Sequence, residues 1–185
     1  MTHVTKPFYL SCFFLGITII EIGKPYKKGT LSLSLGAEVL APEKKLSETH
    51  YTGWGGTTKG EYVFGRHATA TVVTGYYFMR SKNRLNLTEE NIVAVPLKTG
   101  LRYYLGNFYG SGEAGVIFLT DYFRGTTFVY SLGMGDKFKI ASRVIDISLR
   151  HEAWVLNERS RGIIALRVGY EFAVNQKSVV SSPSY

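Results

Sequence analysis

The residues of this chain that could perform chemistry gather in one stretch toward its C-terminal end. Asp146, Ser148, His151 and Glu152 offer two carboxyl groups, a hydroxyl and an imidazole, the groups of a hydrolytic site such as that of a lipid-modifying enzyme. In an extended strand alternate side chains point to opposite faces, so His151 points away from Ser148 and Glu152. Because only a partner on another strand could orient His151, we expect no catalytic residue here and interpret His151 as a polar residue near one rim.

The remaining chemistry-bearing residues lack the spacing of a known site. The single cysteine, Cys12, can form neither a disulfide framework nor a cysteine zinc site. His3, His50 and His67 are isolated in the sequence. The pair Gly55-Gly56 falls inside an expected strand and not between a strand and a helix, so it is not a phosphate-binding loop. We therefore expect no metal ion and no cofactor.

The composition is typical of an all-β protein with one domain. The 185 residues include 13 Tyr, 11 Phe and 20 Gly but only 5 Pro, and 45% of them are hydrophobic. That hydrophobic share excludes a disordered chain. No apolar run reaches the roughly 20 residues that a membrane-spanning helix needs. The net charge is +8, but the basic residues are spread over the whole chain, which argues against a nucleic-acid partner.

The N-terminal residues form a segment of their own. Lys6 precedes the apolar stretch Phe8–Ile20, an order typical of a signal peptide, although no small-residue cleavage motif follows. The alternatives are an apolar β-arm and a misassigned start. We expect residues 1–27 to be a signal or N-terminal segment with a linker, residues 28–172 to be the folded domain, and residues 173–185 to be a polar tail.

From Thr30 onward, apolar and polar residues alternate, which is the pattern of strands with one apolar face. Leu31, Leu33 and Leu35, for example, alternate with serines and a glycine. The pattern recurs in eight segments, which are Thr30–Leu40, Trp54–Phe64, Ala68–Phe78, Val93–Leu105, Gly112–Tyr122, Phe128–Met134, Ile145–Val155 and Ile164–Phe172. Pro96 falls on the polar side of its segment and cannot donate to a ladder, so it predicts a bulge.

The connections between these segments also alternate, between long and short. The short or compact ones are Gly65-Arg66, Gly106–Tyr109 and Asp136–Ser142. The connections at the opposite end of the strands are Ala41–His50, Arg80–Asn91, Asp121–Gly125 and Leu156–Arg161. The first two of these are long. Such asymmetry is typical of antiparallel up-and-down transmembrane β-barrels, whose strands need about 9–11 residues to cross a bilayer.

Volume indicates which face of the barrel is inside. The interior of an eight-stranded barrel is just wide enough for side chains to fill it, and the apolar residues would overfill it. The polar side carries charges of both signs that can persist in a filled lumen only as a bonded network. These residues are Glu38, Lys59, Glu61, Lys98, Arg102, Glu113, Asp146, Arg150, Glu152, Arg167 and Glu171. In the alternative, a soluble lipocalin-like barrel, the apolar side lines a ligand cavity and these charges are solvated.

Aromatic residues gather near both ends of the expected strands. Two such girdles are typical of membrane barrels, although aromatics also favour strands in general. At the end with the long loops lie Trp54, Tyr76, Phe78 and Tyr122, with Trp154 on the polar side of its strand. At the other end lie Tyr62, Phe64, Tyr103, Tyr170 and Phe172.

Several motifs carry a family resemblance. They are Lys28–Gly36, Gly53–Thr57, Glu61-Tyr62, Val95–Tyr104, Gly112–Gly115, Tyr130–Phe138, Asp146–Glu152 and Leu166–Phe172. Through them the chain resembles the small outer-membrane β-barrel domains of Gram-negative bacteria, eight-stranded barrels of the OmpA/OmpX kind. The resemblance implies a location in the outer membrane and assembly through a last strand that ends in an aromatic residue, here Phe172. The tail Ala173–Tyr185 departs from that pattern, with Tyr185 as the alternative terminal aromatic.

We therefore expect a non-enzymatic outer-membrane barrel with a filled lumen, which presents its external loops or supports the envelope. Both termini would be periplasmic, and the expected partners are the barrel-assembly machinery and membrane lipid. Basic residues at the outer rim could meet lipopolysaccharide headgroups or simply be solvated loop charges. They are Lys44, Lys45, Arg80, Lys82, Arg84, Arg124, Arg159 and Arg161. A porin role is disfavoured because aqueous channels typically have about 16 strands, and we expect a monomer.

Overall fold

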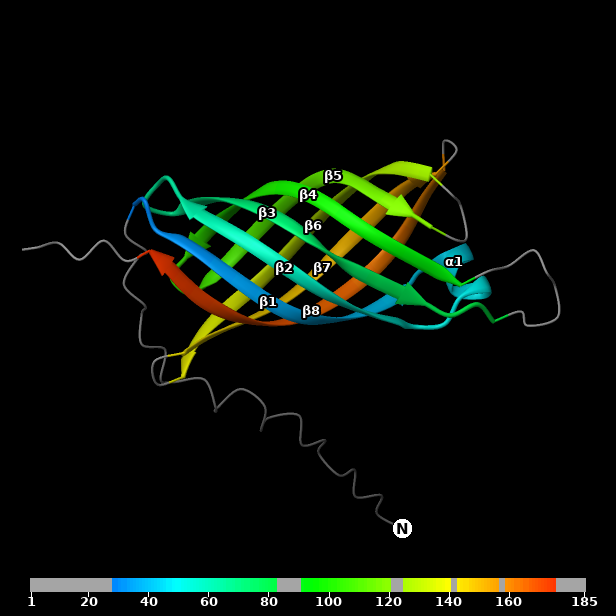
Figure 1. Ribbon diagram of the computed structural model, residues 1–185, viewed down its shortest axis with the longest axis horizontal. Helices are drawn as coiled ribbons and strands as arrows, with labels where there is room; N and C mark the ends of the chain where they lie inside the picture. The colour runs from blue at the N-terminus through cyan, green and yellow to red at the C-terminus, as the bar shows by residue number, and fades with distance from the viewer. Residues whose placement is uncertain (1–27, 83–90, 121–124, 141–142, 157–158, 176–185) are drawn as a thin grey trace, which may run out of the picture.

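The computed structural model describes residues 28–82, 91–120, 125–140, 143–156 and 159–175. Eight antiparallel strands close into one barrel in which each strand pairs with its neighbours in sequence and β8 returns to β1 (Figure 1). The elements are β1 (Leu31–Pro42), α1 (Lys44–Thr49), β2 (Gly53–Val63), β3 (Ala68–Met79), β4 (Ile92–Leu105), β5 (Phe108–Leu119), β6 (Gly125–Ile140), β7 (Arg143–Leu156) and β8 (Arg159–Asn175). The predicted eight-stranded up-and-down barrel is confirmed.

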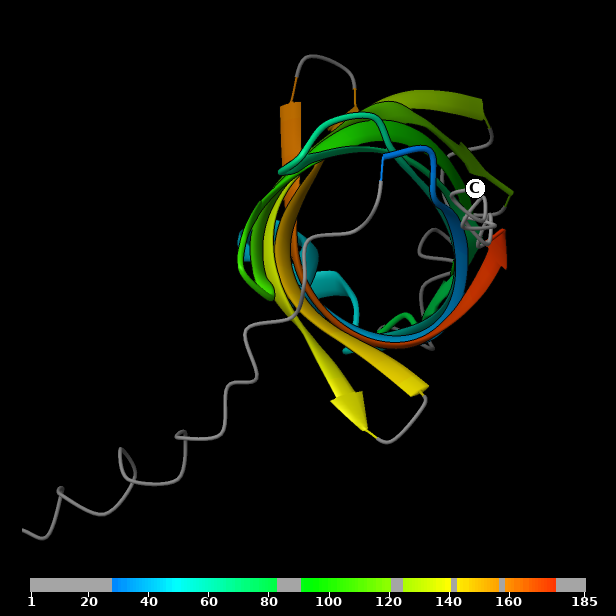
Figure 2. The same ribbon diagram turned by 90° about the vertical axis from the view of Figure 1, so that its left-hand side faces the viewer.

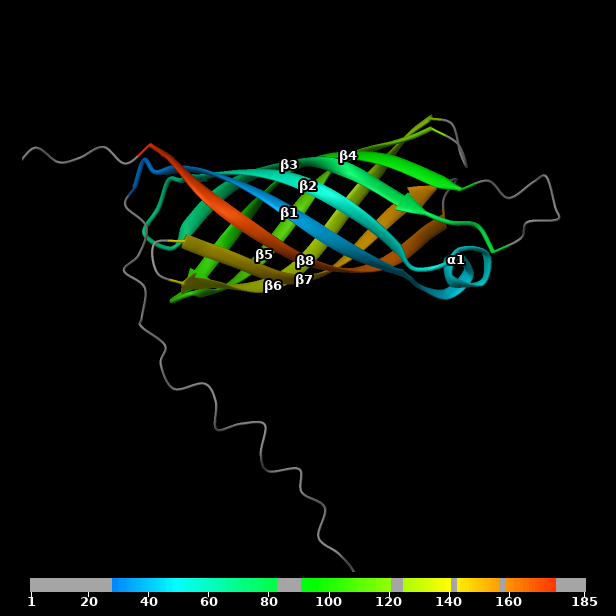
Figure 3. The same ribbon diagram turned by 60° about the horizontal axis from the view of Figure 1, so that its bottom comes forward.

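The barrel has two different ends. The start of β1 and the end of β8 lie together at what we call the terminal end, and α1 lies at the opposite, loop end (Figures 1 and 3). Connections at the terminal end are short: β4 and β5 are joined by Gly106 and Asn107 alone. Gly106 has a φ of 71°, a left-handed value that a glycine adopts without strain. The connections predicted to be short or compact therefore lie at the terminal end, and the two predicted to be long, Ala41–His50 and Arg80–Asn91, follow strands that end at the loop end.

The alternation of side chains follows the sequence pattern around the whole barrel. Apolar residues at outward positions are exposed on every strand, and those at inward positions are buried. The outward set includes Leu35, Trp54, Val72, Leu101, Phe118, Leu132, Leu149 and Val168. This is the reverse of a soluble barrel with an apolar cavity, because the apolar side of each strand faces away from the lumen.

The predicted bulge at Pro96 is wrong. Pairing of β3 with β4 stops at Thr74–Leu97 and resumes at Tyr77–Ala94 with the same register. Pro96 still lies opposite Ile117 of β5. Proline lacks the N–H group that a ladder needs on one side only, so it interrupts one ladder without adding a residue. Between β1 and β8 the register shifts between Leu31 and Ser32, close to the terminal end.

Besides Gly106–Tyr109, which is reduced to Gly106 and Asn107, two connections are shorter than the sequence predicts. The expected connection Asp136–Ser142 is largely strand, because β6 continues to Ile140 and β7 begins at Arg143. The expected connection Leu156–Arg161 also lies mostly in β7 and β8. The polar residues that suggested turns sit at strand positions near a rim, where one side of the sheet already faces water or the lumen.

The long connection Ala41–His50 contains the end of β1 and the helix α1, which the sequence did not predict. Its N-cap residue, Glu43, makes no side-chain capping bond, so local sequence contributes little to this single helical turn. Among the described residues, no helix is long and apolar enough to cross a membrane. The packing that holds α1 is part of the site below.

Candidate functional site

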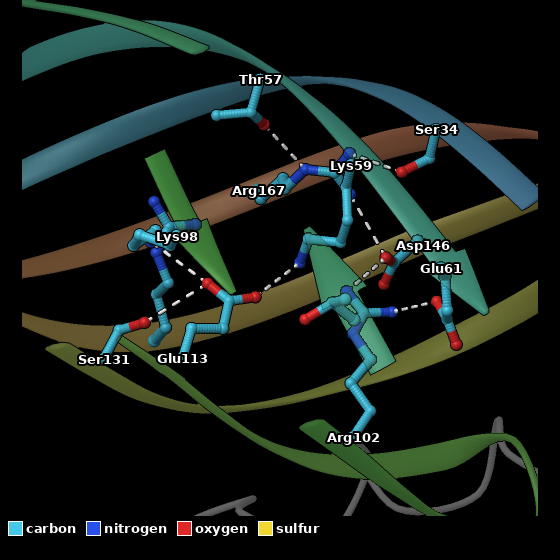
Figure 4. Close-up of polar contacts among 12 residues, drawn as sticks. Ser34, Thr57, Lys59, Glu61, Lys98, Arg102, Glu113, Ser131, Asp146 and Arg167 are labelled. Carbon is cyan, nitrogen blue, oxygen red and sulfur yellow. Dashed lines mark hydrogen bonds and ion pairs between the residues drawn. The ribbon is translucent and has the colours of Figure 1, made fainter. Parts of the chain in front are cut away.

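The lumen is where the structure brings the predicted polar residues together. All eleven side chains of the expected charge network point inward from six strands, with side-chain exposures of 7% or less. Lys137, which the sequence analysis did not include, joins them from β6 with 4% of its side chain exposed. Figure 4 shows part of this arrangement, with basic and acidic groups from opposite walls meeting near the barrel axis.

At the terminal end the network begins with Lys137. Its Nζ lies 2.6 Å from Oε2 of Glu171 and 3.0 Å from Oε2 of Glu61. The same Glu61 oxygen accepts a hydrogen bond from Arg102 Nη1 at 3.1 Å. The other terminal nitrogen of Arg102 donates to Oδ2 of Asp146 at 3.1 Å. Four strands, β2, β4, β6 and β7, and the end of β8 are thereby connected across the lumen.

The middle of the network is centred on Arg167, which is fully buried. Its Nη1 donates to Asp146 Oδ2 at 3.2 Å, and its Nε lies 3.7 Å from Oε1 of Glu38. Nη2 and Nε also donate to the hydroxyl groups of Ser34 and Thr57 at 2.8 and 2.9 Å. A guanidinium group with partners on every nitrogen is well suited to a site without bulk water.

Toward the loop end the network continues from Glu38. Arg150 donates to both carboxylate oxygens of Glu38, at 3.0 and 2.5 Å, and to Glu152 at 3.2 Å. Glu152 also accepts from Lys98 at 2.6 Å, and Lys98 lies 3.1 Å from Glu113. The last member is Lys59, whose Nζ lies 3.2 Å from Oε1 of Glu113.

Among the described residues, the ion pairs of the lumen form a series in which the sign of the charge alternates. It runs Glu171, Lys137, Glu61, Arg102, Asp146, Arg167, Glu38, Arg150, Glu152, Lys98, Glu113, Lys59. Six cations face six anions, so the charges of the series sum to zero. Burying an ion is costly unless it is paired and its hydrogen bonds are satisfied. This balance explains how the lumen can hold so many buried charges.

Neutral side chains complete the hydrogen bonds of the carboxylates. The hydroxyl of Tyr104 donates to Glu61 and that of Tyr109 to Asp146, each at 2.5 Å. The hydroxyl of Tyr77 accepts from Arg150 at 2.7 Å. The Arg102 guanidinium also stacks on Tyr109, with 4.1 Å between its Cζ and the ring centroid.

The sequence analysis missed the three lumen tyrosines because it treated aromatics as outward residues. The alternation of the sequence could have shown that they point inward, since Tyr104 and Tyr109 lie between residues that point outward. Glycine makes room for two of these rings: Tyr77 lies over its cross-strand partner Gly55, and Tyr109 over Gly135. An aromatic ring covering a cross-strand glycine is a known way to fill a barrel wall.

Glycine also makes room for Arg167. Gly36 and Gly169 lie directly opposite each other on β1 and β8, and the Arg167 guanidinium lies against both. A Cβ added at Gly36 would lie 2.7 Å from Arg167 Nε, closer than real contacts allow. Because Gly36 and Gly169 have no side chains, the Arg167 guanidinium can lie close to the backbone of β1 and β8.

At the loop end the lumen is apolar and is closed by α1. Leu46 is 1% exposed and belongs to a buried cluster with inward residues of the strands. The other members are Leu40, Tyr77, Met79, Ile92, Ala94, Ile117, Leu119, Val129, Trp154, Ile163 and Ala165. Trp154 is buried inside and donates its indole N–H to Glu152 at 2.8 Å, so it joins the apolar cluster to the charge network.

Except for Trp154, which is buried in the lumen, the aromatic residues expected at the two rims lie on the outer face wherever the structure describes them. At the loop end Trp54 and Tyr76 are exposed and Phe78 is half-buried, with 5.9 Å between the Trp54 and Phe78 ring centroids. Tyr122 lies outside the described residues. At the terminal end the outward aromatics are Tyr62, Phe64, Tyr103, Tyr170 and Phe172.

Part of the expected basic rim is described. Arg80 and Lys82 are exposed at the loop end, where they line a pocket of about 340 Å³ with Tyr51 and Ser81. Lys82 donates to the Ser47 carbonyl of α1 at 2.5 Å and lies 5.4 Å from the centroid of the Tyr51 ring. Arg161 is half-buried. The side chains of Lys44, Lys45, Arg84, Arg124 and Arg159 lie outside the described part of the chain.

The hydrolytic set considered from the sequence is split between the two faces of β7. Ser148 and Glu152 are buried in the lumen, whereas His151 is on the outer face with 52% of its side chain exposed. His151 Nε2 lies 3.1 Å from Oε2 of Glu43, which precedes α1. Within the described residues, no group of three or more His, Cys, Asp or Glu is placed to hold a metal ion.

Comparison with known proteins agrees with the fold. No family model matches the chain, and no curated protein is similar to it in sequence. Two solved structures of Ail from Yersinia pestis are similar in fold. The outer-membrane protein Ail in a phospholipid bilayer nanodisc matches with a TM-score of 0.55 and 17% identity, over 78% of this chain and 100% of that one. The crystal structure of Ail, the attachment invasion locus protein, matches with a TM-score of 0.54 and 14% identity, over 79% and 100%. The chain thus has the fold of a small outer-membrane β-barrel.

Proposed function

We propose that this protein is an integral outer-membrane barrel without enzymatic activity, which presents its loop end to the surroundings or supports the envelope. The terminal end, with both termini, would face the periplasm. The observation that carries the proposal is the distribution of side chains: a continuous apolar outer face surrounds a lumen whose charges are paired. Such an outer face would be unfavourable in water and favourable in a bilayer, and the pairing of the charges lets the polar side of the strands fill the lumen.

The outer face supports a lipid environment. Large apolar side chains are exposed on every strand, for example Leu35 at 51%, Leu101 at 59% and Leu132 at 69%. Soluble monomers rarely expose a contiguous apolar patch of more than a few hundred Å². Membrane barrels carry such a belt, about 25 Å tall, with aromatic residues at both edges. Closure of β1 on β8 also satisfies the backbone hydrogen bonds that a spanning sheet cannot leave open.

The lumen supports a structural rather than a conducting role. Its cross-section is occupied by the alternating ion series, and its loop end is closed by Leu46 and the apolar cluster. A barrel of eight strands has no room for an aqueous channel beside such side chains. A steady large current in single-channel recordings would contradict this interpretation.

The geometry of β7 supports the absence of an enzymatic role. His151 bonds to Glu43 on the outer face, whereas Ser148 is buried on the opposite face of the same strand. A lipid-modifying activity is the weaker alternative, and it would appear as a change of lipid A acylation on overexpression. An unchanged acylation pattern is expected.

Lipopolysaccharide headgroups are the proposed partner of the loop end. Arg80 and Lys82 are exposed beside Tyr51, at the level where the outer leaflet would place its phosphate groups. Neutral residues at Arg80 and Lys82 should therefore weaken the association of the purified protein with lipopolysaccharide.

The resemblance to outer-membrane barrels further suggests assembly by the barrel-assembly machinery. The closed sheet has no free edge along its paired length, which suits a monomer.

Cell fractionation combined with gel mobility tests the proposed location and state. The protein should be recovered with the outer membrane, and unboiled samples in detergent should migrate differently from boiled ones, because a closed barrel resists unfolding by detergent. Recovery in the soluble fraction without a mobility shift would contradict a membrane role. A lipocalin-like binder would behave in that way.

A further inference from the structure

The hairpin formed by the end of β6 and the start of β7 extends beyond the neighbouring strand β5, while β7 still pairs with β8 at Val144–Glu171 and Ile145–Tyr170. The pairing of β5 with β6 ends at Phe108–Asp136, followed by a hydrogen bond from Lys137 N to the Asn107 carbonyl. Beyond that point β6 pairs only with β7, in the pairs Phe138–Ile145, Lys139–Val144 and Ile140–Arg143. We call residues 138–140 and 143–145 the overhang.

The overhang turns away from the barrel axis. In the view along the barrel, the two strand ends leave the ring of the other strands and project outward (Figure 2). The side view shows the same hairpin projecting from the terminal end, below the wall in that orientation (Figure 1). A strand pair that leaves the ring on its outer side moves toward the lipid that the proposed function places there.

The outward side chains of the overhang continue the apolar outer face of the barrel. Phe138 is 45% exposed and Ile140 is 63% exposed, and they follow Met134, which is 55% exposed on the same side of β6. Ile145 is half-buried beside Phe138. Apolar side chains at this level lie at the boundary between acyl chains and headgroups, where amphipathic segments bind.

The charges of the overhang have one sign. Lys139 and Arg143 are exposed, Arg143 on the side of its cross-strand partner Ile140 and Lys139 on the side of β6 that carries Lys137. The sequence from Lys137 to Ile145 contains no acidic residue. Lys137 itself is engaged inside by Glu61 and Glu171, so it does not contribute to the outer surface. Asp136, on the outward side of β6 at the base of the overhang, is half-buried. Basic residues beside an apolar surface are the usual complement of an anionic membrane surface.

We propose that the overhang binds anionic phospholipid of the leaflet at the terminal end of the barrel. Phe138 and Ile140 insert at the acyl boundary, and Lys139 and Arg143 bind the phosphate groups. The inference rests on the proposed membrane function and adds to it a lipid class and a site. Each basic residue near an anionic surface contributes about 1 kcal/mol, equivalent to about a fivefold preference for the anionic lipid.

Fluorescence quenching by brominated lipids tests the assignment. The reporter is Ile140→Trp in a Trp54→Phe background, in which the native Trp154 is buried in the lumen. The matched control is Leu105→Trp, because Leu105 is 66% exposed at the same end but lies outside the overhang, where it pairs with Phe108 of β5. Each protein is reconstituted in phosphatidylcholine vesicles that contain an equal small fraction of either brominated phosphatidylglycerol or brominated phosphatidylcholine.

The reporter at position 140 should be quenched at least twofold more by the anionic brominated lipid than by the zwitterionic one. Adding Lys139→Gln and Arg143→Gln should remove the difference, and the control at position 105 should show none. Equal quenching of the reporter by both lipids would overturn the lipid preference. If neither lipid quenches the reporter, the overhang lies in water, where its strand edge could pair with an extended peptide. That result would also overturn the proposal. A control at position 105 that no lipid quenches would instead contradict the membrane function itself.

Discussion

Lys98 Nζ lies 2.6 Å from Oε2 of Glu152 in the lumen, and the two side chains are 0% and 1% exposed. The lysine comes from β4 and the glutamate from β7, so the contact joins opposite parts of the barrel wall. Glu152 also accepts from Arg150 and from the indole of Trp154, and Lys98 also contacts Glu113. The pair therefore joins the alternating ion series to the apolar cluster that closes the loop end.

Removing one member of this pair should destabilise the barrel strongly. Lys98→Met leaves Glu152 and Glu113, which are both buried, with one basic partner each. Breaking a buried pair from one side typically costs about 3–5 kcal/mol. We expect a loss of that size in the free energy of unfolding, measured by urea titration of the reconstituted protein.

The control for the Lys98 variant is Lys82→Met, which removes an exposed lysine at the loop end. It should change the free energy of unfolding by less than about 1 kcal/mol. Adding Glu152→Gln to Lys98→Met should recover part of the loss, because the excess negative charge of the lumen is then removed. Equal stabilities of the Lys98 and Lys82 variants would show that the lumen charges are hydrated rather than paired.

A methyl group at Gly169 should disturb Arg167. The Cβ of Gly169→Ala would overlap the Arg167 guanidinium, which would have to move away from Asp146 and Ser34. Forcing an extra methyl group into a packed interior typically costs about 1–3 kcal/mol of unfolding free energy. The matched control is Gly60→Ala, since a Cβ at Gly60 of β2 would have no atom within 4 Å. Similar unfolding midpoints for the two variants would contradict the close packing of Arg167.

The strands and their inward charges could be predicted because the side chains of a strand alternate between two faces. Lys137 shows where that reading failed. It continues the inward parity of β6, but Gly135 and Asp136 precede it and resemble a turn. What keeps Lys137 in a strand is its pairing with Glu61 and Glu171, which lie 76 and 34 positions away in the chain. Partners so distant are visible only once the barrel has closed.

The helix α1 was unpredictable for a related reason. Its six residues carry no side-chain cap and no acidic residue in the first turn. An isolated single turn is unstable in water, so tertiary packing must hold it. That packing comes from Leu46, whose neighbours in the apolar cluster belong to seven different strands.

Shortening Leu46 should therefore release α1 without opening the barrel. Leu46→Ala removes a side chain that is 1% exposed, and such truncations typically cost about 2–5 kcal/mol. We expect faster amide hydrogen exchange in residues 46–51, while the amides of β7 and β8 stay protected. Glu48→Ala, at an exposed position of the same helix, should leave the exchange of α1 unchanged. Faster exchange throughout the barrel would instead show that α1 is part of the global core.

A charged residue on the outer face should destabilise the barrel more when it lies deeper in the bilayer. Leu132 is 69% exposed near the middle of β6, and Leu105 is 66% exposed at the terminal end of β4. If lipid covers this face, Leu132→Arg should lower the free energy of unfolding from vesicles by about 2–4 kcal/mol, whereas Leu105→Arg should lower it by about 0–1 kcal/mol. The two leucines have nearly the same exposure, so loss of burial within the protein cannot produce this difference. In a water-exposed barrel both arginines would be solvated and both costs would be small. The ratio of the two costs therefore separates a membrane barrel from a soluble one by depth alone.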